Sequence, residues 1–216
     1  MKKKSRMPQI GEAVFCIIYL VFDIIAAWIL LTHVEGREYI KLFGILTLVL
    51  AGGDAFHLVP RILNAFKETF DGYEFWAGLG LMISSITMTI FYLLLYQVWG
   101  ALFPNSMTSG ILLILLYGCA FLRIILCLFP QNNWFKKEGN PKWGIYRNVP
   151  FVVVGLIMIL LYVNVKMYAM AMAILISFCC YMPVVLWGKK HSMVGMLMMP
   201  KTAAYMWMIG IGLSLL

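Results

Sequence analysis

Two long and nearly uninterrupted apolar runs, Ile17–Leu31 and Ile111–Leu128, constrain the fold of this chain more than any other feature. A helix needs about 20 mostly apolar residues to cross the hydrocarbon core of a membrane. The composition agrees, because 63% of the 216 residues are hydrophobic and only 12% are charged, whereas soluble domains carry roughly 25% charged residues. The sequence therefore predicts an all-α, polytopic integral membrane protein without an extramembrane domain.

Seven transmembrane helices fit the chain as a single domain over residues 1–216, which includes a short basic tail at residues 1–10. The expected spans are residues 11–32, 39–59, 75–99, 108–128, 147–165, 168–187 and 197–216. The break between the fifth and sixth spans is the shortest, with four residues from Asn164 to Met167.

The lysines and arginines outside these spans are unevenly divided between the two sets of loops. Twelve lie in the N-terminal tail and in the second, fourth and sixth loops, and three lie in the other loops. Loops rich in Lys and Arg face the cytoplasm. The sequence thus predicts a multi-pass protein of the plasma membrane, with the N-terminus cytoplasmic and the C-terminus extracytoplasmic.

Several classes of function are disfavoured by the composition. The net charge of +8 lies in loops, and no basic patch is interleaved with exposed aromatic residues, so no nucleic-acid partner is expected. The five cysteines fall in apolar segments without a CxxC pair, which argues against a zinc site or a disulfide framework. We expect no metal and no cofactor, and we expect membrane lipids as partners.

Three ionisable side chains share one face of the second span near its predicted cytoplasmic end. Asp54, His57 and Arg61 are spaced by three and four residues, which places them within about 60° of one another around a helix. Pro60 should kink or end the helix there. Two interpretations are open: a structural Asp–Arg pair that caps the span, or a functional pocket.

Other ionisable residues lie within the predicted membrane region, where such groups are costly and usually functional. Asp23 lies near the middle of the first span, on the same face as Tyr19, and must find a partner inside the bundle. Arg123 either snorkels to the cytoplasmic surface or pairs with Asp54 or Asp23. For Lys201, at the start of the last span, snorkelling is the favoured interpretation.

The polar residues within the spans gather on one side of the membrane. Those in the predicted cytoplasmic half are Asp54, His57, Ser84, Ser85, Arg123, Cys180 and Lys201. The serines and Cys180 also fit ordinary helix packing. Because the other half holds almost no ionisable group, this asymmetry favours an inward-facing cavity over a continuous ion path.

The segment from Gly53 to Arg61, with its Gly-Asp dipeptide and a proline after an apolar stretch, resembles the YhhN family of lysoplasmalogenases. The following stretch, Gly78–Tyr92, is similar to the family's next span, with Ser85 and Tyr92 at comparable spacing. The resemblance implies a compact multi-span enzyme that hydrolyses the vinyl-ether bond of lysoplasmalogens. It also implies site roles for Asp54, Ser85 and Tyr92.

The chain departs from the family pattern at two positions. Ile86 stands where members usually have a histidine, and the stretch Phe178–Tyr181 lacks their Ser-Asp pair. Members also commonly have eight spans rather than seven. These departures leave open a relative that kept the fold and lost the activity.

Vinyl-ether hydrolysis requires an acid to protonate the enol-ether carbon and a base to activate water. We expect Asp54 to be catalytic, with His57 or Asp23 as its partner. Arg61, Arg123 or Lys201 would bind a lipid phosphate near the inner leaflet, and Ser85 and Tyr92 would contact the substrate. The alternative is a small-solute transporter, or a protein that binds a ligand without turnover.

Overall fold

A computed structural model describes residues 7–66, 72–136, 139–188 and 192–216. Within these residues the chain is helical and contains no strand, which confirms the all-α prediction. The long helices are α1 Met7–Thr32, α2 Glu38–Phe66, α3 Tyr73–Leu102, α4 Gly110–Leu128, α5 Pro141–Asn164, α6 Tyr168–Trp187 and α8 Met198–Leu213. A 3₁₀ turn, η1 Pro130–Asn132, and the short helix α7 Ser192–Gly195 lie between them. The first six residues of the predicted basic tail lie outside the described part of the chain.

Six of these helices, α1 to α6, are long and apolar enough to cross a membrane. Their outward faces carry large apolar side chains, among them Trp28 and Ile114, which are 67% and 74% exposed. A soluble protein would not present so much apolar surface to water. The predicted seventh span is present as α8, but its 16 residues extend only about 24 Å, which is less than the roughly 30 Å core of a bilayer.

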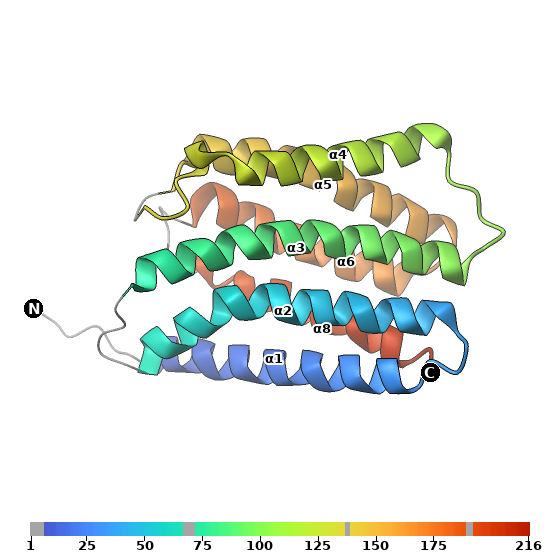
Figure 1. Ribbon diagram of the computed structural model, residues 1–216, viewed down its shortest axis with the longest axis horizontal. Helices are drawn as coiled ribbons and strands as arrows, with labels where there is room; N and C mark the ends of the chain where they lie inside the picture. The colour runs from blue at the N-terminus through green and yellow to red at the C-terminus, as the bar shows by residue number, and fades with distance from the viewer. Residues whose placement is uncertain (1–6, 67–71, 137–138, 189–191) are drawn as a thin grey trace, which may run out of the picture.

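The long helices form a closed ring. Each one packs against the next along the chain, from α1 through to α6, and α8 closes the ring by packing against both α6 and α1. Successive helices run in opposite directions (Figure 1). The starts of α1, α3, α5 and α8 and the ends of α2, α4 and α6 therefore lie at one end of the ring, which we call the charged end.

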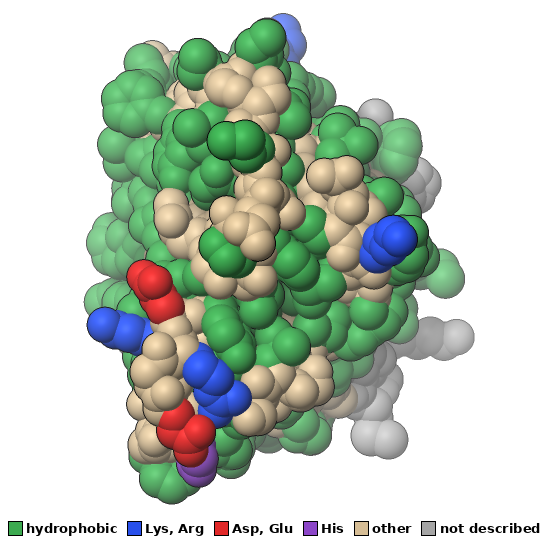
Figure 2. Space-filling view, turned by 90° about the vertical axis from the view of Figure 1, so that its right-hand side faces the viewer, with side chains coloured by type: hydrophobic (Ala, Val, Ile, Leu, Met, Phe, Trp, Pro, Cys, Tyr) green, Lys and Arg blue, Asp and Glu red, His purple; other side chains and the backbone are tan. Residues whose placement is uncertain are grey.

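The opposite end carries the α1–α2, α3–α4 and α5–α6 connections and the C-terminus. Figure 2 shows this face: most of its charged side chains gather at one edge, at the lower left, and the rest of the face is mainly apolar and uncharged polar. The break between α5 and α6, residues 165–167, is a tight turn in which Lys166 adopts a positive φ of 61°. The predicted boundary at this turn is therefore confirmed.

Two helices are longer at the charged end than the sequence predicted. Asn140 caps α5 by accepting a hydrogen bond from the backbone N–H of Lys142, so this helix begins at Pro141 rather than at residue 147. Pro60 does not end α2, which continues to Phe66 and bends in its last turns (Figure 1). The additional turns of α2 carry Arg61 beyond the proline.

Glycines bring α2 and α3 close together at the level of Asp54. A Cβ atom on Gly80 would lie 2.7 Å from the Cα of His57 and would also meet the carbonyl of Phe56. A Cβ on Gly53 would meet the side chain of Thr87, whereas one on Gly52 would meet nothing within 4 Å. The close approach is therefore made by Gly53 and Gly80 and not by Gly52.

Candidate functional site

Asp54 is a buried carboxylate held by two neutral hydroxyl groups. The Tyr19 hydroxyl on α1 donates a hydrogen bond to Oδ2 at 2.9 Å, and the Ser84 hydroxyl on α3 donates one to Oδ1 at 2.9 Å. Asp54 is 8% exposed. No cationic group of the described residues forms an ion pair with Asp54. The interpretation of Asp54 as half of a structural Asp–Arg pair is therefore wrong.

Asp54 faces a cavity inside the helix ring at the charged end, which we call the central cavity. Six helices contribute to its walls, all the long ones except α1. Its lining residues are Asp54, His57, Leu58, Leu81, Ser84, Ser85, Met88, Arg123, Phe151, Tyr181, Met198, Lys201, Thr202 and Tyr205. The cavity volume is about 70 Å³. Because one water molecule needs roughly 10–15 Å³, the cavity has room for several water molecules.

Two buried cations line the central cavity. Arg123 is 1% exposed, and its guanidinium carbon lies 3.2 Å from the centre of the Phe151 ring. Lys201 is 7% exposed, with its ammonium nitrogen 5.0 Å from the centre of the Tyr205 ring. Neither forms an ion pair with a carboxylate of the described residues. The prediction that Arg123 snorkels or pairs with an aspartate is therefore wrong, as is that of a snorkelling Lys201.

His57 lies between the central cavity and Arg61. Its Nε2 atom is 3.5 Å from Nη1 of Arg61, whereas Nδ1 has no hydrogen-bond partner among the described residues. The Arg61 guanidinium turns away from the central cavity and forms an ion pair with Glu12 on α1. Arg61 therefore does not join the other predicted phosphate-binding residues.

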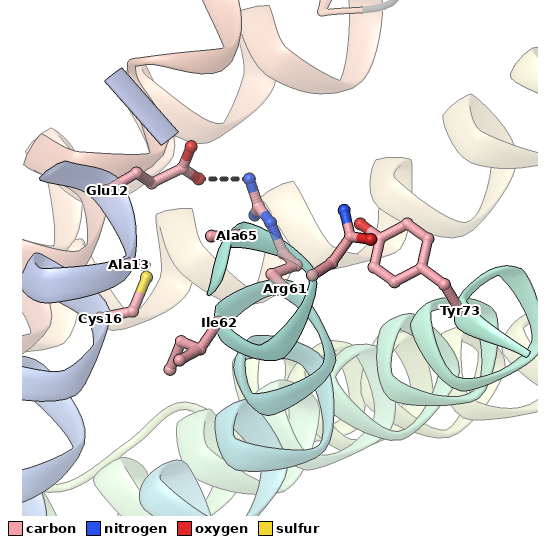
Figure 3. A pocket seen from close by; sticks show the side chains of 8 residues that line it. Glu12, Ala13, Cys16, Arg61, Ile62, Ala65 and Tyr73 are labelled. Carbon is pink, nitrogen blue, oxygen red and sulfur yellow. Dashed lines mark hydrogen bonds and ion pairs between the residues drawn. The ribbon is translucent and has the colours of Figure 1, made fainter. Parts of the chain in front are cut away.

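The Glu12–Arg61 ion pair crosses a second cavity, between α1 and α2 at the charged end (Figure 3). Cys16 and Ala13 lie on the α1 side of this cavity, and Tyr73 lies at the start of α3. The volume of this second cavity is about 150 Å³. Because Arg61 borders this space and also contacts His57, it separates the two cavities.

Asp23 does not reach the central cavity. Its carboxylate is fully buried, and neither oxygen has a hydrogen-bond partner that meets ordinary geometry among the described residues. It faces the Tyr19 hydroxyl. Tyr19 thus lies between the two aspartates, in line with the shared helix face predicted for Tyr19 and Asp23.

The two remaining predicted site residues differ in their positions. Ser85 lines the central cavity, although its hydroxyl donates to the carbonyl of Leu81 one turn earlier. Tyr92 is fully buried one level deeper, with its ring against Phe151 and Phe178. Five of the eight predicted residues therefore meet at the central cavity: Asp54, His57, Ser85, Arg123 and Lys201.

The two residues that bind Asp54 were not among the eight predicted site residues. Ser84, rather than its neighbour Ser85, binds Asp54. Tyr19 supplies the other hydrogen bond. The spacing of four residues between Tyr19 and Asp23 was the sequence feature that could have indicated Tyr19. Which of the adjacent serines binds Asp54 depends on the rotation of α3 about its axis, and no pattern in the sequence indicates that rotation.

The central cavity combines a carboxyl group, an imidazole and two cations that an anion could bind. Such convergence of polar groups in an apolar, enclosed space is typical of a ligand or active site. Within the described residues, no group of three or more His, Cys, Asp or Glu side chains is arranged to hold a metal ion. No family model, curated protein or solved structure matches the chain.

Proposed function

We propose that this protein is a membrane-embedded lipid hydrolase of the lysoplasmalogenase type, which cleaves the vinyl-ether bond of a lysophospholipid at Asp54. The observation that carries the proposal is the setting of this carboxyl group. Asp54 faces a cavity that six helices enclose, and its bonded partners are the neutral hydroxyls of Tyr19 and Ser84. No cation of the described residues competes with a substrate for this carboxyl group.

The reaction needs one proton delivered and one returned. The carboxyl group of Asp54 would protonate the vinyl carbon distal to the ether oxygen, which leaves an oxocarbenium ion. Water then adds to the carbon bonded to oxygen and returns a proton to the carboxylate. The resulting hemiacetal breaks its C–O bond to give an aldehyde and the free glycerol hydroxyl. His57, which lines the same cavity, is the second acid–base group within the site.

We also propose that α8 crosses the plasma membrane as a seventh span, with the N-terminus in the cytoplasm. The packing of α8 against both α1 and α6 in the ring supports a membrane position. Backbone hydrogen bonds from Leu197 to Val194 and from Met199 to Met196 continue helical turns from α7 into α8 and lengthen the segment. The positive-inside rule supports the orientation, and a C-terminal tag accessible only from outside intact cells tests it.

The direct test is aldehyde release from a lysoplasmalogen by the purified protein in nanodiscs. We expect turnover by the wild type and a loss of about 10²–10⁴-fold in Asp54→Asn, the range associated with a general acid. Glu38→Gln is the matched control, since it makes the same change at the exposed start of the same helix. Absence of aldehyde from a folded wild-type sample would refute the enzymatic proposal.

A second candidate is a lipid-binding protein without turnover. It is favoured by Ile86 at the position of the family histidine and by the position of Asp23, which lies outside the central cavity. Among the described residues, Asp54 is the one carboxyl group that lines the cavity, so the acid–base pair depends on His57. Tight lysophospholipid binding combined with no aldehyde release would select this candidate.

A further inference from the structure

We propose that Arg123 and Lys201 form a binding site for a phosphate ester in the central cavity. The proposal takes the cavity from the proposed function and names the chemical group that it holds. The identity of the ligand as a lysophospholipid rests on the proposed function, whereas the binding of a phosphate group requires no turnover. An experiment can therefore refute the phosphate site without refuting the hydrolase activity, and the reverse.

Arg123 is the centre of this site. Its side chain is 1% exposed, and Nε and Nη1 have no hydrogen-bond partner among the described residues. Burial of a charged group without a partner is costly, so this arginine gains more from binding an anion than a solvated one would. The guanidinium carbon lies 3.2 Å from the centre of the Phe151 ring, and this cation–π contact holds the group in place while Nε and Nη1 stay available to an anion.

Lys201 supplies the second positive charge from a different helix. Its ammonium nitrogen lies 5.2 Å from the centre of the Tyr181 ring and 5.0 Å from that of Tyr205. The same two tyrosines are electrostatic neighbours of Arg123. The two cations and both tyrosines line the central cavity, with Arg123 on α4, Tyr181 on α6, and Lys201 and Tyr205 on α8.

The charge balance of the cavity favours an anion. Arg123 and Lys201 line it together with a single carboxylate, Asp54, whose hydrogen bonds come from hydroxyl groups. Arg61 forms an ion pair with Glu12 and so does not add to the charge of the central cavity. The guanidinium edge matches two oxygens of a tetrahedral phosphate, and the lysine adds a point charge. A lipid headgroup or free phosphate would supply the same chemistry.

The test measures binding to the full-length protein in a maltoside detergent, which contains no phosphate. Titration calorimetry would compare a lysophosphatidylethanolamine with a monoacylglycerol of the same chain. We expect binding of the lysophospholipid to exceed that of the monoacylglycerol by at least about tenfold, because the neutral lipid leaves both cations unpaired. Equal affinity for the two lipids would overturn the proposal.

Inorganic phosphate distinguishes the two sources. If it displaces the lysophospholipid, the site recognises the phosphate group alone. If it does not, the acyl chain is also required, and the phosphate proposal then stands on the difference between the two lipids. In either case the result is independent of aldehyde release, so a protein that binds but does not hydrolyse would refute only the proposed function.

Variants locate the site. Arg123→Gln and Lys201→Gln should each weaken lysophospholipid binding about tenfold or more, while Lys41→Gln, which removes an exposed charge at the opposite end, should not. Lys201→Gln provides the test if Arg123→Gln fails to fold. Unchanged affinity in both folded cavity variants, or in Lys201→Gln when it alone folds, would place the phosphate elsewhere and contradict the proposal.

Discussion

The two ends of the helix ring treat buried polar groups differently. At the opposite end, Trp99 donates to the carbonyl of Leu161 and the Tyr162 hydroxyl donates to that of Leu95. At the charged end, Arg123 and His57 are buried with unpartnered nitrogens. The two aromatic side chains at the opposite end are thus satisfied by the chain itself, although Nε of Arg37 there also lacks a partner among the described residues. The unpartnered nitrogens at the charged end differ in that their side chains line a cavity.

The largest expected effect on stability is at the opposite end. Trp99→Ala removes a side chain that is 2% exposed and stacks on Tyr96, and should lower the free energy of unfolding by about 3–5 kcal/mol. Denaturant titration in mixed micelles measures this change. Trp28→Ala, at a lipid-facing position that is 67% exposed, is the control and should lose much less. Equal losses would show that the opposite end is not packed as described.

At the charged end, replacing a buried side chain by an apolar one should stabilise the protein. Arg123→Met replaces a buried, unpaired guanidinium with an apolar side chain of similar length, and should raise the free energy of unfolding by about 1–4 kcal/mol. The same variant should lose lysophospholipid binding. Stability and binding measured on one preparation check both expectations. A variant that is less stable than the wild type would indicate that Arg123 holds the fold together instead of serving a ligand.

The close approach of α2 and α3 tests how the cavity is built. Gly80→Ala places a Cβ against the backbone of α2 and should cost about 1–3 kcal/mol. Gly52→Ala is the matched control, since its Cβ meets nothing within 4 Å. It should be neutral or stabilising, because alanine favours a helix over glycine by roughly 0.5–1 kcal/mol. A thermal-unfolding comparison of the two variants would contradict the helix contact if they behaved alike.

The smallest effect is expected at the surface of the opposite end. Glu35 forms an ion pair with Arg37 at 3.3 Å, and its side chain is 74% exposed. Glu35→Gln should therefore change stability by no more than about 0.2–1 kcal/mol, and less at high salt. Unfolding curves at low and high salt measure it. A loss above this range would mean that charged groups also organise the opposite end.

The spans could be predicted because each depends on a local apolar run. The placement of Asp54 and His57 on a common face also followed from spacing along α2, and both line the cavity. The partners of the arginines could not be predicted. Arg61 reaches Glu12 on another helix and Arg123 lies on Phe151, and both contacts depend on how helices rotate against one another.

Lys201 shows a second limit of the sequence. An isolated span that begins with lysine is expected to extend its ammonium group to the membrane surface. Here α8 closes the ring, and Lys201 lies on its inward face beside Tyr205. Ring closure is a property of all the helices together, so no local pattern around Lys201 could indicate it.

The most direct measurement of the central claim is lysoplasmalogen turnover by wild-type protein, Asp54→Asn and Glu38→Gln, assayed side by side as aldehyde release in nanodiscs. If Asp54 is the acid of a hydrolytic site, the wild type and Glu38→Gln release aldehyde at equal rates and Asp54→Asn loses about 10²–10⁴-fold. Turnover that persists in a folded Asp54→Asn protein, or that is absent from the folded wild type, would contradict the claim.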